Sequence, residues 1–389
     1  MNKEQYSITN LPKTQKIIED GMDERLHIGA QGYISIQGII VADFALGHAT
    51  LGKDDLASSI CSEGRVQAPP SIRLTHRTLM PWMSAGKPVV AVAIAQLWER
   101  GLVDIEEYIS KYIPGFARYG KGDITVKHLL THTSGLQPIN PKCEADSWHR
   151  IMSHVMESPL YEDWEPGKQA GYDPSSGWCV LGEIIKQVDG RDYTEYVRSE
   201  IFEPLGMEDS WLSIPGDKVK EYGDRLAILH DSKGALITEP HSDPLLYSVP
   251  LPGGAGRGPI GELGKFYEML LMGGEFAGQR VLRPETVGSL VYRHRVGMLD
   301  RTFGAVYDWG LGFLLAGRTP ESKNLAYQYG KYSSNEVFGH GGYQSSIGFA
   351  DPEHNLVVAW VMNGTPGETV HSRRNYSINS AIYEDLGII

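Results

Sequence analysis

The stretch Ser84-Ala85-Gly86-Lys87, followed by an apolar run over residues 88–98, decides how this sequence is interpreted. It is the only Ser-x-x-Lys in the chain. Residues three apart share one face of a helical turn, so the amine of Lys87 can reach the hydroxyl of Ser84. A serine becomes a nucleophile when a base takes its proton, and burial lowers the pKa of a lysine enough to make it that base. The stretch therefore predicts a helix that carries a serine nucleophile at its start.

The composition is that of a globular protein and excludes several functional classes. Of 389 residues, 41% are hydrophobic, which is enough to bury at least one sizeable core. A formal net charge of −12 argues against a nucleic-acid partner, because phosphates are neutralised by basic surfaces. No apolar run reaches the ~18 residues that span a bilayer, and no apolar secretory segment stands near the N-terminus. Together with three widely spaced cysteines, these features predict a cytoplasmic protein with reduced thiols and no membrane partner.

Strand patterns lie at both ends of the chain, and helical patterns fill its middle. Strands are expected on either side of a turn at Gln37-Gly38 and over residues 307–315, 337–340, 345–349 and 356–362. Helices are expected over residues 88–100, 125–131, 149–157, 177–189, 193–201, 260–273, 284–292 and 370–386. This order predicts an α/β (α+β) protein in which one sheet is assembled from both termini. We assign residues 1–80 and 290–389 to a discontinuous sheet-containing domain and residues 81–289 to a mostly helical domain, with the active site at their interface.

Two further motifs follow the Ser-x-x-Lys stretch. Tyr172-Asp173-Pro174 precedes a predicted apolar helix, and Phe338-Gly339-His340-Gly341-Gly342-Tyr343 precedes a predicted strand. A serine and lysine on a helix, a tyrosine on a loop and a glycine-rich strand resemble the three-part site of serine β-lactamases and penicillin-binding proteins. Residues 124–136, 202–207, 270–279 and 363–364 also look familial, so the likeness runs in order from about residue 28 to 386. On these motifs the chain resembles the class C β-lactamase-like superfamily, which includes family VIII carboxylesterases, D-aminopeptidases and the acyltransferases of statin biosynthesis.

The resemblance implies a β-lactamase/transpeptidase-like fold, with an antiparallel sheet flanked by helices and an inserted helical domain. It also implies a role for each motif residue. Ser84 matches the acylated nucleophile, Lys87 its base or proton shuttle, and Tyr172 the tyrosine that passes a proton to the leaving group. The backbone N–H groups of Ser84 and Tyr343 match the two donors of the oxyanion hole, where negative charge develops during acyl transfer.

Two positions depart from the β-lactamase pattern. Pro174 stands where an asparagine usually holds the substrate's amide, and His340 stands where a lysine often binds a substrate carboxylate. Both changes weaken the case for β-lactam substrates, and His340 is either a substrate-binding group or a structural hydrogen-bonding group. We expect Gly341 and Gly342 to let the substrate approach the backbone, and Trp82 to form part of the pocket wall.

Three competing motifs are weaker. His340-Gly341-Gly342 also occurs in the oxyanion loop of α/β-hydrolases, but the chain has no Gly-x-Ser-x-Gly elbow. His128 and His132 have the spacing of a metal pair without a third ligand, so we expect structural roles and no metal. The glycine-rich segment 253–258 does not fit the spacing of a nucleotide loop, and we expect it to border the acyl pocket.

These features predict a serine hydrolase that forms an acyl-enzyme with small or medium carboxylic esters and needs no metal or organic cofactor. The alternatives are an acyltransferase of natural-product biosynthesis, a D-amino-acid amidase or peptidase, and a weak β-lactamase. A catalytically inactive member that binds an acylated ligand belongs to a different class, and the intact Ser84, Lys87 and Tyr172 argue against it. The predicted partner is a small-molecule ester or amide, and the sequence leaves the oligomeric state open.

Overall fold

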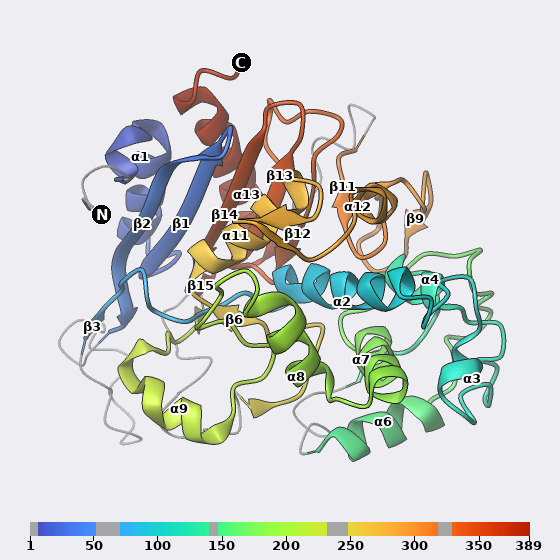
Figure 1. Cartoon of the computed structure of the whole chain (residues 1–389). Helices are drawn as coiled ribbons and strands as arrows, with labels where there is room; N and C mark the ends of the chain where they lie inside the picture. The colour runs from blue at the N-terminus through green and yellow to red at the C-terminus, as the bar shows by residue number, and fades with distance from the viewer. Residues whose placement is uncertain (1–6, 52–70, 140–146, 232–247, 318–328) are drawn as a thin grey trace.

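A seven-stranded sheet forms the centre of the computed structural model, which describes residues 7–51, 71–139, 147–231, 248–317 and 329–389. The strands follow the order β11–β12–β13–β14–β1–β2–β3, and every neighbouring pair is antiparallel. Their bounds are β1 (Gly29–Ile36), β2 (Ile39–Thr50), β3 (Ile72–Arg73), β11 (Leu314–Leu315), β12 (Phe338–Gly342), β13 (Ser346–Asp351) and β14 (Leu356–Met362). Because β1 pairs with β14, the two ends of the chain build one sheet, as predicted (Figure 1).

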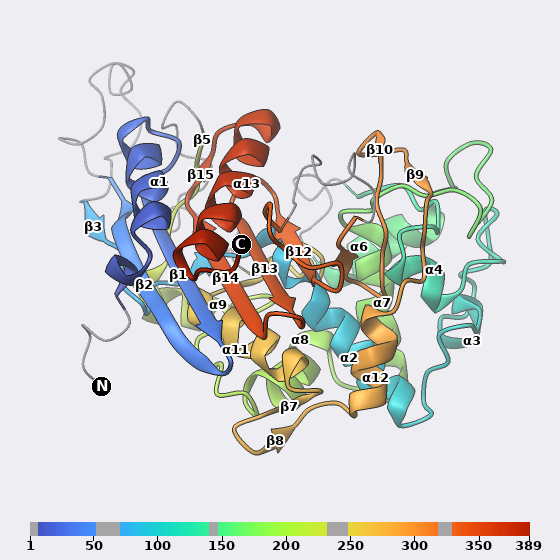
Figure 2. The same cartoon turned by 90° about the horizontal axis from the view of Figure 1, so that it is seen from above.

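Helices cover both faces of this sheet, and helices, loops and four two-stranded sheets form the rest of the described molecule. Their bounds are α1 (Pro12–Asp23), α2 (Lys87–Glu99), α3 (Ile109–Tyr112), α4 (Val126–Leu130), α6 (Trp148–Glu157), α7 (Ser176–Asp189), α8 (Tyr193–Val197), α9 (Gly216–Tyr222), α11 (Ile260–Leu271), α12 (Pro284–Val291) and α13 (Glu368–Asp385). Helices α1 and α13 lie side by side, as Figure 2 shows, and Lys13 of α1 pairs with Glu384 of α13. The predicted antiparallel sheet flanked by helices is therefore confirmed.

Residue alternation along β1 explains why both faces of the sheet are covered. Successive side chains of a strand point to opposite faces. Ile34 belongs to the core cluster that contains Ile18 of α1 and Ile378 of α13. On the opposite face the Tyr33 hydroxyl donates to the buried carboxylate of Glu268 on α11, over 3.3 Å. Both faces of β1, β13 and β14 are therefore buried, apart from the half-buried Ile36 at the end of β1.

Helix α2 lies between the sheet and the helical part of the chain (Figure 1). Its residues from Lys87 to Leu97 are all buried, as expected of a helix that is apolar on every side. A 3-10 turn, η2 (Met83–Gly86), precedes it, and Pro88 occupies its first turn, where no backbone hydrogen bond is lost. The predicted helix is therefore confirmed, and Ser84 lies in the turn just before it.

The predicted strand over residues 307–315 is wrong for most of its length. Only Leu314–Leu315 joins the sheet, by pairing with the start of β12. Gly312 has a φ of +83°, and its N–H donates to the carbonyl of Leu130 in α4 over 2.8 Å. Trp309 exchanges backbone hydrogen bonds with Arg295, over 2.9 and 3.0 Å. The segment therefore folds toward the helical part of the chain, which the pattern of apolar residues did not indicate.

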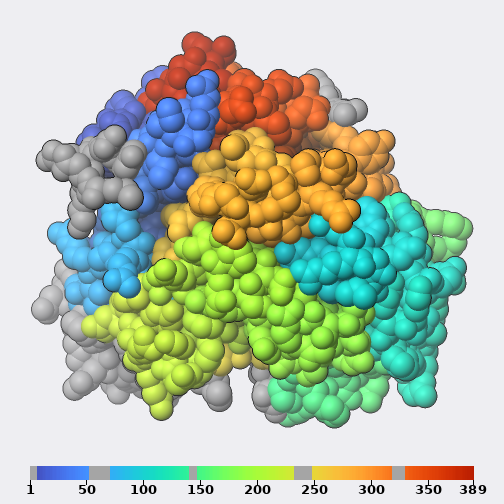
Figure 3. Space-filling model, in the orientation of Figure 1, coloured from blue at the N-terminus to red at the C-terminus, as the bar shows by residue number. Residues whose placement is uncertain are grey.

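The first and last segments adjoin on one side of the molecule, and the middle of the chain forms the other side (Figure 3). The division into domains at residues 81 and 289 stays a prediction. Helix α11 falls within the segment that we assigned to the helical domain, but it packs on the sheet: Tyr267 lies against Gly348 of β13. None of the helices among the described residues has the length and hydropathy needed to cross a membrane.

Candidate active site

Ser84 lies in the η2 turn, and this turn is held tightly against the sheet. Met83 has a φ of +52°, a region that residues with a side chain rarely occupy and that is common at functional sites. The Ser346 hydroxyl of β13 donates to the carbonyl of Trp82 over 2.6 Å. A Cβ atom added to Gly342 of β12 would lie 2.3 Å from the same carbonyl oxygen. Only glycine therefore allows β12 to approach the nucleophile's turn this closely.

Lys87 is fully buried beneath Ser84. Its Nζ atom lies 3.1 Å from Ser84 Oγ, and it also donates to the carbonyls of Pro174, over 2.9 Å, and Gly253. Burial lowers the pKa of Lys87 to about 7, while the negative charge of Asp173 acts in the opposite direction. Much of the amine is therefore neutral near pH 7 and able to accept the proton of Ser84.

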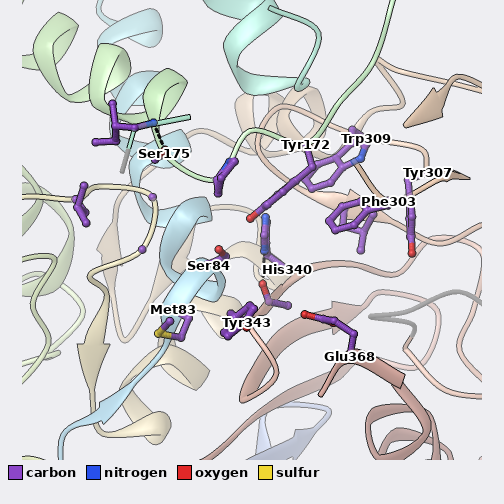
Figure 4. Close-up of a pocket in the computed structure, with 17 residues that line it drawn as sticks. Met83, Ser84, Tyr172, Ser175, Phe303, Tyr307, Trp309, His340, Tyr343 and Glu368 are labelled. Atoms are coloured by element: carbon purple, nitrogen blue, oxygen red, sulfur yellow. Dashed lines mark hydrogen bonds between the residues drawn. The ribbon is translucent and has the colours of Figure 1, made fainter. Parts of the chain in front are cut away.

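Tyr172 completes this group from the loop before α7. Figure 4 shows its hydroxyl directed toward Ser84 and His340. The Nζ atom of Lys87 lies 5.3 Å from the centre of the Tyr172 ring. Burial raises the pKa of the phenol, so it keeps its proton at neutral pH. The structure thus brings the predicted Ser84, Lys87 and Tyr172 together.

The loop that carries Tyr172 is anchored by its neighbour Asp173. The buried carboxylate of Asp173 accepts hydrogen bonds from the backbone N–H groups of Ser175, Ser176 and Gly177, over 2.8, 3.0 and 2.6 Å. It therefore satisfies three N–H groups at the start of α7 that would otherwise lack partners. Asp173 fixes the position of the tyrosine relative to the helix.

The rings of His132 and His128 accept backbone hydrogen bonds and so stabilise the local fold. His132 Nδ1 accepts the backbone N–H of Asp173 over 3.1 Å, and its ring centre lies 4.6 Å from that of Tyr172. His128 Nδ1 accepts the backbone N–H of Thr125 over 3.2 Å and completes the cap of α4. Within the described ranges, no three His, Cys, Asp or Glu side chains are grouped as ligands of a metal ion.

At its C-terminal end, one edge of β12 faces the cavity. In the described sheet, β11 pairs only with Phe338 and Gly339, so the rest of β12 pairs with β13 alone. The chain then turns at Tyr343 and Gln344, and Gln344 has a φ of +47°. The buried guanidinium of Arg374 donates to the carbonyl of Gln344 over 2.8 Å and holds this turn. The backbone of Tyr343, the predicted second oxyanion donor, therefore has a fixed position at the cavity edge.

His340 is buried and lines the cavity. Its Nδ1 lies 2.6 Å from the carbonyl of Gly341, which only accepts, so Nδ1 carries the proton. Its Nε2 has no hydrogen-bond partner within the described chain. Burial, with the nearby charge of Lys87, lowers the pKa of His340 to about 3. The imidazole is therefore neutral and cannot replace the lysine that binds a carboxylate.

The cavity above Ser84 has a volume of about 390 Å³ and is mostly apolar. Ser84, Tyr172, His340, Gly341 and Tyr343 line it, as predicted, and Gly253 and Gly254 confirm the expected border of the glycine-rich segment. A row of aromatic rings and one carboxylate form its far wall (Figure 4). These residues are Phe303, Tyr307, Trp309 and Glu368.

Trp82 and Gly342 do not line this cavity. The prediction that Trp82 forms part of the pocket wall is corrected: its ring is buried in the core, and its Nε1 donates to the carbonyl of Gly258 over 3.0 Å. Its backbone N–H donates to Gly256 over 2.7 Å. Gly342 lies behind the cavity, against Trp82. Both residues fix the position of the nucleophile's turn.

A buried ion pair that the sequence did not indicate supports Tyr172. Arg295 Nη2 lies 3.0 Å from Asp300 Oδ2, and the two side chains are 1% and 0% exposed. The other carboxylate oxygen of Asp300 accepts the backbone N–H groups of Tyr172, Thr302 and Phe303, over 3.0, 3.0 and 3.1 Å. Leu299-Asp300-Arg301 resembles an exposed loop in sequence, and no motif links it to Tyr172.

Comparisons with known proteins identify the family and the fold. A family model described as Beta-lactamase matches residues 15–382. Esterase/beta-lactamase LipL of Mycobacterium tuberculosis is 26% identical over 312 residues, which cover 72% of this chain and 68% of LipL. A penicillin-binding protein homologue from Caulobacter crescentus has the same fold, with a TM-score of 0.77 and 23% identity over 98% of both chains. A family VIII carboxylesterase gives a TM-score of 0.76 and 22% identity, again over 98% of both chains. The predicted β-lactamase/transpeptidase fold is confirmed.

Proposed function

Because this chain belongs to the beta-lactamase family, we propose that it is a serine hydrolase that cleaves small or medium carboxylic esters through an acyl-enzyme. One observation carries the proposal: the buried amine of Lys87, with its pKa lowered to about 7, lies 3.1 Å from Ser84 Oγ at the base of an apolar cavity. A base near neutral pKa beside a serine hydroxyl is what nucleophilic catalysis requires.

In the first half of the reaction, the proton of Ser84 passes to Lys87 while Oγ bonds to the ester carbonyl carbon. The backbone N–H groups of Ser84 and Tyr343 donate to the oxygen that becomes negative. The bond from carbon to the alcohol oxygen then breaks, and Tyr172 supplies the proton with which the alcohol leaves. Lys87 returns its proton to Tyr172, so that the acyl-enzyme forms with no net change in protons.

In the second half, water attacks the acyl carbon and gives one proton to the pair formed by Lys87 and Tyr172. The bond between the acyl carbon and Ser84 Oγ breaks, the carboxylic acid is released, and the serine regains its proton. Burial lowers the pKa of Lys87 to about 7, which suits it as the base at neutral pH, and keeps the phenol of Tyr172 protonated, so that it has a proton to donate.

The cavity favours esters over β-lactams as substrates. β-Lactams carry a carboxylate, and the buried His340, with a pKa of about 3, offers no positive charge to bind it. Pro174 has no side-chain amide to hold the substrate's amide. Both features leave an apolar, aromatic cavity suited to the uncharged part of an ester.

Hydrolysis of p-nitrophenyl butyrate tests this proposal. The wild-type enzyme is expected to release p-nitrophenol, and Ser84→Ala is expected to abolish turnover together with labelling by a serine-directed phosphonate. Labelling that persists in Ser84→Ala would refute the assignment of the nucleophile. Adding alcohols or amines and measuring the ratio of transfer to hydrolysis separates the hydrolase from the acyltransferase alternative.

A further inference from the structure

One ring nitrogen of His340 has no hydrogen-bond partner, although the side chain is buried in the wall of the catalytic cavity. His340 is 4% exposed and lines this cavity. Its Nδ1 atom donates to the carbonyl of Gly341, so Nε2 carries a lone pair and can only accept a hydrogen bond. Nε2 finds no donor among the described residues. Because an unpaired buried acceptor destabilises a protein, this nitrogen indicates a ligand that donates a hydrogen bond.

The other polar side chains of the cavity wall do not offer the same kind of acceptor. Trp309 Nε1 is also buried without a partner in the described chain, but an indole nitrogen only donates. Ser175 Oγ accepts a backbone N–H over 3.1 Å, and Glu368 accepts from the side chain of Gln344 over 3.4 Å. Among the described lining residues, His340 Nε2 is therefore the one buried acceptor without a donor.

His340 lies beside the residues that move the proton of the nucleophile. Its ring centre is 6.0 Å from that of Tyr172, and the Tyr172 hydroxyl is directed toward Ser84 and His340 (Figure 4). Burial, together with the nearby charge of Lys87, keeps the pKa of His340 at about 3. The imidazole therefore takes up no proton near neutral pH, and it borders the region in which water meets an acyl group on Ser84.

We propose that His340 Nε2 binds the water that hydrolyses the acyl-enzyme, and that it thereby favours water over alcohols as the acceptor of the acyl group. This inference rests on the proposed esterase function. Water has two O–H groups. As its oxygen bonds to the acyl carbon, one proton passes to the pair formed by Lys87 and Tyr172, while the other stays on the oxygen and donates to His340 Nε2. The bond to Ser84 Oγ then breaks, Oγ takes up the first proton, and the second remains as the O–H of the carboxylic acid.

An alcohol cannot make both contacts. Its single O–H gives its proton to Lys87 and Tyr172, so that its alkyl group, rather than an O–H, meets His340 Nε2. The buried nitrogen then stays without a donor, and the step lacks a hydrogen bond that water makes. Sites that hold a substrate O–H with a buried polar group reject analogues without it for the same reason. His340 thus directs the acyl-enzyme toward hydrolysis and away from acyl transfer.

Competition between water and methanol for the acyl-enzyme tests the inference. The enzyme is given p-nitrophenyl butyrate in buffer that contains methanol, and the ratio of methyl butyrate to butyric acid is measured. In His340→Leu this ratio is expected to rise at least about tenfold, because only the reaction with water loses a hydrogen bond. His340→Gln keeps a neutral acceptor and is expected to stay close to the wild-type ratio. A merely structural role of His340 would slow the release of p-nitrophenol without changing the ratio.

His149→Leu is the matched control for this competition. His149 is an exposed residue of α6 and does not line the cavity, so the variant is expected to keep the wild-type ratio. A ratio in His340→Leu equal to that of the control would overturn the inference.

A measurement on the wild-type enzyme does not depend on a folded variant. Methylamine and dimethylamine have similar basicity, but only methylamine keeps an N–H for His340 after one proton has passed to Lys87. With the uncatalysed reaction subtracted, the wild-type enzyme is expected to form N-methylbutanamide at least about tenfold faster than N,N-dimethylbutanamide, and His340→Leu is expected to reduce this difference. Equal rates in the wild type would overturn the inference, while release of p-nitrophenol would leave the proposed function intact. If the wild-type enzyme released no p-nitrophenol, the proposed function itself would fail.

Discussion

The Nζ atom of Lys87 lies 3.1 Å from the Oγ atom of Ser84, in a position closed to solvent. Two carbonyl groups, those of Pro174 and Gly253, take hydrogen bonds from the same amine. These carbonyls orient the amine, and burial keeps a large part of it neutral, with a pKa of about 7. The pair is therefore prepared to activate the serine before any substrate binds.

This pair predicts how the rate depends on pH. Because Lys87 acts in its neutral form, kcat/KM for an uncharged ester should rise with pH through about 7 and level off above it. His340→Gln should keep this midpoint, since His340 is already neutral across the range, with a pKa of about 3. A pH profile of kcat/KM from pH 5 to pH 9 checks both points. A midpoint that disappears in His340→Gln would transfer the role of base to the histidine.

Lys87→Met should separate activity from stability. The variant should lose about 10² to 10⁴ in kcat, because it has no general base. The pKa of Lys87 is lower in the folded protein than its ordinary 10.5, so the unfolded chain binds more protons, and this residue makes stability rise with pH between about 7 and 10.5. Urea unfolding should show that the variant loses this rise. Identical pH dependence of the unfolding free energy in the two proteins would contradict the lowered pKa.

Gly342→Ala should damage catalysis through the oxyanion hole. The added Cβ would lie 2.3 Å from the Trp82 carbonyl and 2.1 Å from Ser346 Oγ, so β12 must move away from the turn that carries Ser84. Loss of one oxyanion donor costs about 10² to 10³ in kcat, and a comparable fall is expected here. Gly288→Ala is the control, because nothing lies within 4 Å of an added Cβ in α12. Wild-type kcat in Gly342→Ala would show that the close approach of β12 is not needed.

Asp300→Asn should reduce both stability and activity. It leaves the buried Arg295 without its anion, and breaking a buried pair costs about 3–5 kcal/mol of unfolding free energy. The double variant Arg295→Met with Asp300→Leu removes the unpaired charge but also the acceptor of three backbone N–H groups, including that of Tyr172. It should therefore remain less stable than the wild type, and it should remain slow. Denaturant unfolding and kcat, measured on both variants, check this. A double variant with wild-type kcat would show that Asp300 does not position the tyrosine.

The parts of the fold that could be predicted are those with a strong periodic pattern. The hairpin of β1 and β2, strand β14 and helix α2 all have continuous apolar or β-branched patterns, and each was confirmed. Residues 307–315 have a similar composition but contain Gly312 with its positive φ, and the chain joins the sheet only after it, at Leu314. Local composition does not reveal which distant surface a segment will contact, so the strand prediction failed.

The site could be predicted where it rests on spaced motifs, and could not where it rests on tertiary contacts. Ser84, Lys87 and Tyr172 come together as the motifs indicated. Trp82 is adjacent in sequence to the nucleophile's turn, but its ring points into the core. Asp300 is far from every motif and meets Tyr172 only through the folded chain. Proximity in sequence to a catalytic residue therefore says little about which side chains meet the substrate.

Mass spectrometry of the intact protein during turnover tests the central claim most directly. Wild-type enzyme and Ser84→Ala are mixed with p-nitrophenyl butyrate, quenched in acid within the first turnover and weighed, and the adduct is mapped by peptide digestion. The account predicts that the wild-type protein gains the mass of one butyryl group on the peptide that contains Ser84, and that Ser84→Ala gains none. A butyryl group on another residue, or turnover that continues in Ser84→Ala, would contradict it.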